Sequence, residues 1–449
     1  MSPNAEKLNA VLAKEAPTIL AMLSRRGREI AFPHGGILGQ TAEAKGKRFN
    51  ATIGIALEED GSPMRLASME QYVHVPAADV YPYASSFGKK ELREQWRRMM
   101  KEKNTNIASP MTLPVVTAGL THALSVAGSL FLDAGDTVIL PDLFWGNYRL
   151  IFEHQYDANL KTFPTFRGEG FDVAGLREAL NDGPIGKRVL LLNFPNNPTG
   201  YAPTTQEAWE IVSVIRDTAH AGNTVTVLLD DAYFGLCHEQ GMFTDSLFGE
   251  LAALHANVLP VKIDGATKED YAWGQRVGFL TYGHEKITPS VATALEDKTA
   301  GTVRASVSNA CHLSQSLLLM AYRSPDYLQE KHEKSILLRA RYEAVKSALK
   351  DMEFRRYFSA LPFNSGYFMC VRLAEGLDAE LIRKTLLRDF DTGVIATGDL
   401  LRIAFSSIPT ADIPKLFGNI AAACSKHMHS HPHSPPNPLP LSAHAVAHR

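Results

Sequence analysis

Between about residues 90 and 310, the chain alternates short apolar runs with segments of helical periodicity. The apolar runs lie at 113–116, 137–140, 189–194, 224–229, 257–263 and 278–282. Unbroken apolar strands of this length are typical of sheets that helices cover on both faces. One helical segment offers Thr204 and Thr205 as N-caps and ends before Gly222. The alternation predicts an α/β fold with a mostly parallel sheet and a ligand site at the carboxyl ends of its strands.

The chain has 449 residues, which is longer than chains that usually fold around a single hydrophobic core, so we expect two domains. We predict a large domain over 66–319 and a smaller α+β domain made of 1–65 and 320–426. A long amphipathic helix at 326–350 would link them. Residues 427–449 are rich in histidine, proline and serine, which predicts a disordered tail. Its alternating histidines could bind a transition metal loosely, but an incidental solvated tail is the favoured interpretation, so we predict no metal site.

Composition argues against several classes of partner. The formal net charge of −2 gives no electrostatic reason to expect nucleic acid or an anionic membrane. No stretch has the length of apolar sequence that a bilayer requires, and the N-terminus lacks the apolar core of a signal peptide. The cysteines stand far apart, at Cys237, Cys311, Cys370 and Cys424. This spacing favours a reducing cytoplasm and packing roles over disulfides or a zinc site.

Two loops that follow predicted strands have the composition of ligand sites. Residues 117–124 (TAGLTHAL) form a glycine turn that opens a helix, which exposes backbone N–H groups to an anion. Residues 193–200 (NFPNNPTG) contain two prolines that fix the backbone and hold Asn197 at a strand end. A tight turn in which the asparagines bond their own backbone explains the second loop equally well.

Two further motifs bring charged groups to strand ends. Asp230 continues a buried strand, and a buried carboxylate requires a cation or strong donors. Tyr233 follows three residues later and could present its hydroxyl to the same ligand. Lys268 comes just after the next strand, and Arg276 stands eight positions further on. A lysine near glycines and an arginine suits a covalent imine beside a bound phosphate.

Taken in order, the motifs G-x-x-x-A-L, N-P-T-G, D-x-A-Y, T-K with R-V-G downstream, and R-I-A-F resemble those of class I aminotransferases of fold type I. The resemblance runs from about residue 50 to 407, and the segment 144–148 (FWGNY) is especially similar to the aspartate aminotransferase branch. It implies a transaminase that uses pyridoxal 5'-phosphate to move an amino group between an amino acid and a 2-oxo acid.

The resemblance also implies roles at the cofactor ring. Lys268 would form the imine with pyridoxal phosphate and, once substrate displaces it, shuttle a proton. Asp230 would pair with the pyridine nitrogen and keep it protonated. Asn197 and Tyr233 would bind the phenolic oxygen of the ring, and Trp145 would stack on its face. Trp145 and Asn197 are also expected to contact the substrate.

At the phosphate, the resemblance implies the backbone amides of Leu120 and Thr121 together with Arg276. Many relatives also have a serine three residues before the lysine, where this chain has Gly265, so Thr267 is expected to take over that contact.

The resemblance implies that the substrate is held at its carboxylates. Arg402 matches the arginine that binds the α-carboxylate through two parallel bonds. Ile53 and Gly54 match a mobile segment that covers the substrate. Arg304 aligns with an arginine that the partner subunit supplies for a second carboxylate, which makes aspartate, glutamate or aromatic substrates a hypothesis. A local ion pair at a helix end or an interface explains Arg304 equally well.

A homodimer is implied because Tyr83 matches a tyrosine that reaches the neighbouring subunit's phosphate. Two alternatives remain open at this point. A β-lyase or decarboxylase on the same fold would share the lysine, aspartate and arginine. A ligand-sensing regulator would carry a DNA-binding helix-turn-helix ahead of the matched region, where only about fifty residues stand and no basic recognition-helix pattern occurs.

Overall fold

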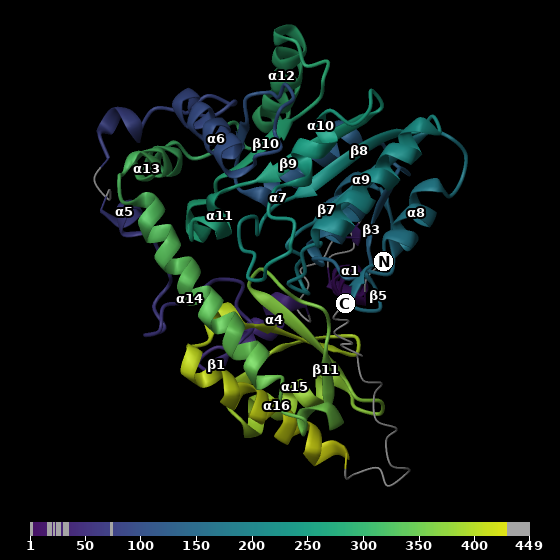
Figure 1. The fold of residues 1–449 in the computed structure, drawn as a ribbon, viewed down its shortest axis with the longest axis vertical. Coiled ribbons are helices and arrows are strands. Elements are labelled where there is room, and N and C mark those ends of the chain that lie inside the picture. The colour runs from purple at the N-terminus through teal and green to yellow at the C-terminus, as the bar shows by residue number, and fades with distance from the viewer. Residues whose placement is uncertain are drawn as a thin grey trace, which may run out of the picture.

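The computed structural model describes residues 3–15, 20, 23, 28–29, 36–71 and 75–428 (Figure 1). Its centre is a seven-stranded sheet with the order β2-β10-β9-β8-β7-β3-β4. The strands are β2 (Val115–Thr117), β3 (Thr137–Pro141), β4 (Asn159–Phe163), β7 (Lys187–Asn193), β8 (Thr224–Asp230), β9 (Val258–Asp264) and β10 (Gly278–Tyr282). Only β10 runs antiparallel to its neighbours in this sheet, so the prediction of an α/β fold with a mostly parallel sheet is confirmed.

Helices cover the sheet, which is why its central strands are buried along nearly their whole length. The covering helices include α7 (Leu120–Phe131), α8 (Val173–Asn181), α9 (Thr205–His220) and α10 (Leu247–Ala252). Helix α9 begins with a capping box, in which Thr204 Oγ1 accepts from the backbone of Glu207 and the Glu207 carboxylate accepts from the backbone of Thr204. The edge strand β4 was not anticipated, because it is half exposed and has no continuous apolar run.

A second, four-stranded antiparallel sheet has the order β11-β12-β15-β14. Its strands are β11 (Phe358–Ala360), β12 (Phe368–Leu373), β14 (Ile395–Thr397) and β15 (Leu400–Ala404). This sheet and the helices α15 (Ala379–Asp389) and α16 (Ile413–Met428) form a hydrophobic core of their own, to which Tyr342 and Val345 of α14 (Tyr327–Ala348) also belong. In Figure 1, α14 runs from the larger core to the smaller one. The two cores support a two-domain division, whose boundaries stay a prediction.

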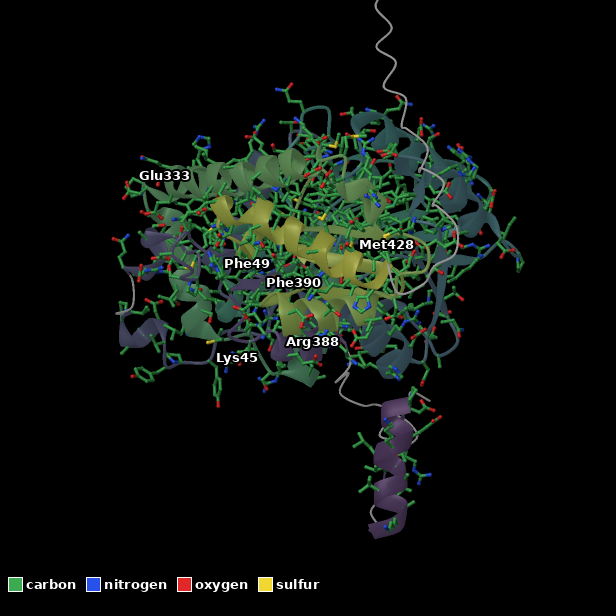
Figure 2. All side chains as sticks on the ribbon, turned by 90° about the horizontal axis from the view of Figure 1, so that it is seen from below. Lys45, Phe49, Glu333, Arg388, Phe390 and Met428 are labelled. Carbon is green, nitrogen blue, oxygen red and sulfur yellow. The ribbon has the colours of Figure 1, made fainter. Side chains whose placement is uncertain are left out.

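Part of the N-terminal segment joins the smaller core. Strand β1 (Phe49–Asn50) pairs in parallel with β13 (Thr392–Gly393), and Phe49 packs in the same cluster as Phe390 (Figure 2). Helix α4 (Ile37–Glu43) lies against β13 and β14. Helix α1 (Pro3–Glu15) projects from the body in Figure 2, with Leu8 and Val11 each 52% exposed.

The C-terminal boundary differs slightly from the prediction. Helix α16 continues through His427, whose Nε2 lies 2.9 Å from Thr385 Oγ1, so the helix includes the first two residues assigned to the tail. The rest of that predicted tail, 429–449, lies outside the described residues, as does most of 16–35. No helix in the described part of the chain is long and apolar enough to cross a membrane.

Candidate active site

A cavity of about 320 Å³ opens at the carboxyl ends of β7 and β8, beside the turn that follows β9. Its volume lies in the range of small-molecule sites. The candidate residues that line it are Gly54, Leu120, Thr121, Trp145, Asn197, Asp230, Tyr233, Thr267, Lys268, Arg276 and Arg402. These residues are spread over nearly 350 positions of sequence, and the parallel sheet brings most of them to one edge.

Asp230 is the last residue of β8 and is buried. Its Oδ2 accepts a hydrogen bond of 2.5 Å from the hydroxyl of Tyr148, and its Oδ1 accepts one of 3.2 Å from the backbone of Ala232. Burial raises the pKa of Asp230, while the Tyr148 hydrogen bond and the charge of Lys268 lower it. A buried carboxylate in this setting is suited to a cationic ring nitrogen.

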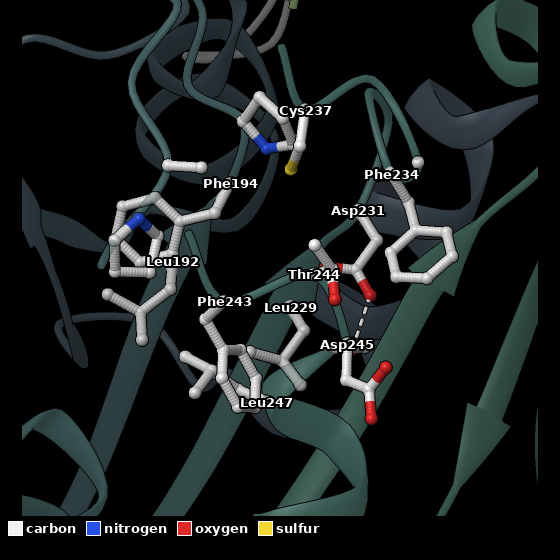
Figure 3. A pocket seen from close by; sticks show the side chains of 15 residues that line it. Leu192, Phe194, Leu229, Asp231, Phe234, Cys237, Phe243, Thr244, Asp245 and Leu247 are labelled. Atoms are coloured by element: carbon white, nitrogen blue, oxygen red, sulfur yellow. Dashed lines mark hydrogen bonds between the residues drawn. The ribbon is translucent and has the colours of Figure 1, made fainter. Parts of the chain in front are cut away.

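The neighbouring Asp231 faces another part of the protein. It forms a buried ion pair with Lys262 and accepts a hydrogen bond of 2.6 Å from Ser246 Oγ, drawn as a dashed line in Figure 3. It borders a second cavity of only about 30 Å³, which has room for about one water. Because successive side chains at a strand end point to opposite faces, Asp230 lines the larger cavity while Asp231 contacts Lys262 and Ser246.

Lys268 lies on the short helix α11 (Ala266–Glu269), directly after β9. Burial lowers the pKa of Lys268 to about 8, the nearby Arg276 also lowers it, and Asp230 raises it. Its Nζ lies 5.3 Å from the ring centroid of Tyr233. Lowering the pKa of a lysine increases the fraction of neutral amine near neutral pH, to about a tenth at one unit below the pKa, and the neutral amine is the form that condenses with an aldehyde.

The two residues after Lys268 are anchored by buried charges. Glu269 pairs with Lys103 at 2.8 Å and with Lys331 at 2.6 Å, and Asp270 pairs with Lys331 at 3.1 Å. Burial alone would raise the pKa of Glu269, but the two ammonium groups hold it well below its usual value. Sequence reasoning missed this cluster, because its members come from three separate helical segments.

The N-terminus of α7 forms one end of the cavity. Gly119 precedes this helix with φ 86°, and a Cβ there would stand 2.6 Å from Arg276 Nη2. Glycine therefore lets the guanidinium approach the free N–H groups of the helix. The Thr267 Oγ1 is buried and has no hydrogen-bond partner among the described residues. An oxyanion that accepts from these donors fits this end of the cavity.

Steric crowding by backbone atoms explains why residue 265 is a glycine. A Cβ on Gly265 would lie 2.7 Å from the carbonyl oxygen of Val277 and 2.9 Å from the Cα of Gly278. Backbone atoms cannot move aside as a flexible side chain can, so the serine of many relatives does not fit here. The unpartnered Thr267 hydroxyl is the available replacement.

Arg402, on β15, is buried and points a cation into the cavity. Its Nη2 donates to the carbonyl oxygen of Thr52 at 3.0 Å, and its Nη1 donates to Asn197 Oδ1 at 3.1 Å. Its Nε lacks a hydrogen-bond partner, and no carboxylate pairs with Arg402 within the described ranges. Thr52 directly precedes Ile53 and Gly54, so the guanidinium also anchors the segment expected to cover the substrate.

Three candidates do not line this cavity within the single chain: Ile53, which stands next to the lining residue Gly54, Tyr83 and Arg304. Tyr83 is 93% exposed, and Arg304 is exposed in the last turn of α12 (Pro289–Ser306). The end of α12 nevertheless contacts the turn that opens α7, because His122 accepts from the backbone of Ala118 and its Nε2 lies 2.8 Å from Ser306 Oγ.

Six cavity residues were not assigned from the sequence: Ile37, Leu124, Tyr148, Asn193, Ala232 and Phe368. Tyr148 and Asn193 lie within motifs that were identified in the sequence, a few positions from Trp145 and Asn197, which were assigned to the site. Ile37 and Phe368 belong to segments whose position depends wholly on tertiary packing.

Comparison with known proteins decides the family. The model of the family "Aminotransferase class I and II" matches residues 74–420. The chain belongs to this family. A curated relative, the cytoplasmic aspartate aminotransferase of Saccharomyces cerevisiae, is 23% identical over 316 residues, which are 67% of this chain and 73% of the relative. The aspartate aminotransferase of Thermotoga maritima is 27% identical over 60% of this chain and 68% of its own.

Solved structures show the same fold. An aminotransferase from Anaerococcus prevotii superposes with a TM-score of 0.79, covers 90% of this chain and 99% of its own, and shares 23% of its residues. A kynurenine aminotransferase from Pyrococcus horikoshii, solved with pyridoxamine phosphate, gives a TM-score of 0.74 at 14% identity and covers 91% of this chain and 98% of its own.

This aminotransferase therefore uses pyridoxal phosphate to transfer an amino group from an amino acid to a 2-oxo acid. A β-lyase or decarboxylase is not favoured, since the relatives are aspartate, tyrosine and diaminopimelate aminotransferases. The residues of the cavity fit the cofactor: the unpartnered Thr267 hydroxyl and the donors of α7 suit its phosphate, and Asp230 suits its ring nitrogen.

Proposed function

We propose that the cavity between the two cores is the transamination site, with Lys268 as the residue that binds pyridoxal phosphate covalently. The observation that carries this proposal is the distribution of charge in one cavity. Lys268 lies with a buried carboxylate, Asp230, and with two cations, Arg276 and Arg402. The lysine amine would match the cofactor's aldehyde, and the Asp230 carboxylate would match its ring nitrogen. The two cations would match the cofactor's phosphate and the carboxylate of an amino acid.

The cofactor's phosphate would be held by Arg276, the Thr267 hydroxyl and the backbone amides of Leu120 and Thr121. Glycine at position 119 allows these donors to converge. When bound, the ring supplies an electron sink for the electrons released at the amino acid's Cα. Trp145 would cover one face of that ring, since it also lines the cavity.

Around the ring, the protein's own groups would hold the protons in place. Asp230 would keep the proton on the pyridine nitrogen. Burial raises the pKa of Tyr233, so its hydroxyl stays protonated and would donate to the phenolic oxygen beside Asn197. Lys268 Nζ would hold and move the proton released at the amino acid's Cα, since it is the amine that lies with Asp230 and Tyr233 in the cavity.

The substrate's α-carboxylate would bind to Arg402, whose guanidinium lines the cavity and is oriented by the Thr52 carbonyl oxygen and by Asn197 Oδ1. Gly54 and Ile53 would close over the bound amino acid. We further propose a dicarboxylic or aromatic substrate, with Arg304 of a partner subunit at a second carboxylate. Relatives named as aspartate and tyrosine aminotransferases support this substrate class.

We propose that the enzyme works as a homodimer in amino acid metabolism in the cytoplasm. The exposed Tyr83 would reach the phosphate site of the neighbouring subunit, and Arg304 would reach its substrate site. A relative named as a cytoplasmic aspartate aminotransferase supports the location.

The test is an absorbance scan of the purified enzyme against a panel of amino acids, repeated on Lys268→Ala. The wild type should show a visible band that borohydride bleaches and that the preferred amino acid converts to that of pyridoxamine phosphate. Lys268→Ala should lose the covalent attachment, whereas the exposed control Lys90→Ala should keep it. An unchanged, borohydride-reducible chromophore in Lys268→Ala would overturn the assignment of this lysine.

A further inference from the structure

Tyr148 is a buried polar residue of the cavity that the proposed mechanism does not yet use. Its ring has no solvent exposure, and its hydroxyl donates to Asp230 Oδ2 at 2.5 Å. The two residues are 82 positions apart in the sequence. A hydrogen bond this short, to a buried carboxylate, is among the stronger contacts a neutral side chain can make.

Tyr148 is also held rigidly. Its backbone N–H donates to the carbonyl oxygen of Trp145 at 3.0 Å, so both aromatic residues belong to one turn. Its ring packs edge-on against Trp145, with centroids 5.6 Å apart, and lies tilted against Phe152, with centroids 6.1 Å apart. The turn therefore positions the residue expected over the cofactor ring and the residue that contacts Asp230.

The hydrogen bonds of Asp230 are divided between its two oxygens. Oδ1 accepts from the backbone of Ala232, and Oδ2 accepts from Tyr148. A third bond, from Asn193 Nδ2 to the Asp230 carbonyl oxygen at 2.7 Å, fixes the backbone. Tyr148 is thus the only side chain that bonds this carboxylate among the described residues, and the carboxylate orientation depends on it.

We propose that Tyr148 is a positioning residue that acts through Asp230 to keep the cofactor's ring nitrogen protonated. The inference rests on the proposed role of Asp230. A donor on Oδ2 lowers the proton affinity of the carboxylate, so the proton shared with the ring nitrogen stays on the nitrogen. Burial and Asp230 raise the pKa of Tyr148 well above its usual value, so it remains a donor at all physiological pH values.

The test compares Tyr148→Phe with the wild-type holoenzyme. The substitution removes the hydroxyl and keeps the ring, so the packing with Trp145 and Phe152 is retained. The matched control is Tyr156→Phe, at the end of the same helical segment, whose hydroxyl bonds Ser125 instead of Asp230. Each protein is loaded with cofactor that carries ¹⁵N in the ring. The ¹⁵N chemical shift, the cofactor Kd and the thermal unfolding midpoint are then measured.

In Tyr148→Phe, we expect the ¹⁵N resonance to move toward the position of an unprotonated pyridine and the cofactor Kd to rise about tenfold. Tyr156→Phe should keep both values. If Tyr148→Phe lowers only the unfolding midpoint and leaves the ¹⁵N shift in place, the hydroxyl is merely structural and the inference is wrong.

A third variant, Asp230→Asn, separates this inference from the function on which it rests. If Asp230→Asn moves the ¹⁵N resonance and Tyr148→Phe does not, the role of Tyr148 fails while that of Asp230 stands. If neither variant moves it, the role of Asp230 fails, and the inference fails with it.

Discussion

Replacement of Arg402 by lysine tests how the enzyme recognises its substrate. The guanidinium can form two parallel, charge-assisted hydrogen bonds with a carboxylate, each worth about 1.5–3 kcal/mol. Lysine keeps the charge but supplies one such bond, and it cannot also reach Thr52 and Asn197, which hold the guanidinium in place. Loss of one such bond should raise the Kd of the amino acid about 10- to 100-fold, since about 1.4 kcal/mol corresponds to a tenfold change in Kd.

The assay is the single-turnover half-reaction followed by absorbance, with an amino acid and with the amine that lacks its carboxylate. For Arg402→Lys we expect the apparent Kd of the amino acid to rise by that factor, while the rate with the amine stays within about threefold of the wild type. The control is Arg372→Lys on the neighbouring strand β12, where the side chain is exposed and pairs with Asp399. An equal loss with the amine, or an unchanged Kd for the amino acid, would refute the assignment of Arg402 to the carboxylate.

Three further predictions concern the proposed active site. Arg304→Ala should reduce kcat/KM selectively with aspartate and glutamate, and an equal loss with alanine or leucine would remove the second-carboxylate hypothesis. Gly265→Ser should overpack the backbone at the phosphate site and cost about 1–3 kcal/mol of unfolding free energy in urea. Gly274→Ser, where a Cβ meets nothing within 4 Å, is its control, and equal stability of the two variants would contradict the steric argument. Because Lys268 is protonated and unreactive below its pKa of about 8, the rate at which cofactor-free enzyme recombines with pyridoxal phosphate should rise with pH through that value and then level off. A rate independent of pH in stopped-flow measurements would show that Lys268 is not the titrating nucleophile.

The fold class was readable from the chain because its determinants are local. The apolar runs that became β7, β8 and β9 carry a pattern that is typical of strands in a sheet covered on both faces. The motifs at their ends were readable for the same reason, since the polar residues that follow parallel strands must meet at one edge. Strand β4 was missed, because an edge strand that is half exposed needs no continuous apolar run.

The amino acid sequence by itself determined which groups were available at the strand ends, including Asp230, Lys268 and Asn197. Only the tertiary structure decided which partners they meet. The contact of Tyr148 with Asp230 spans 82 positions, and that of Arg402 with Asn197 spans 205. The tertiary structure also decided that Asp230 faces the cavity and that Asp231 faces away from it. Local sequence fixes the period and capping of each element, whereas contacts between distant elements depend on how the sheets and helices pack, which no local pattern encodes.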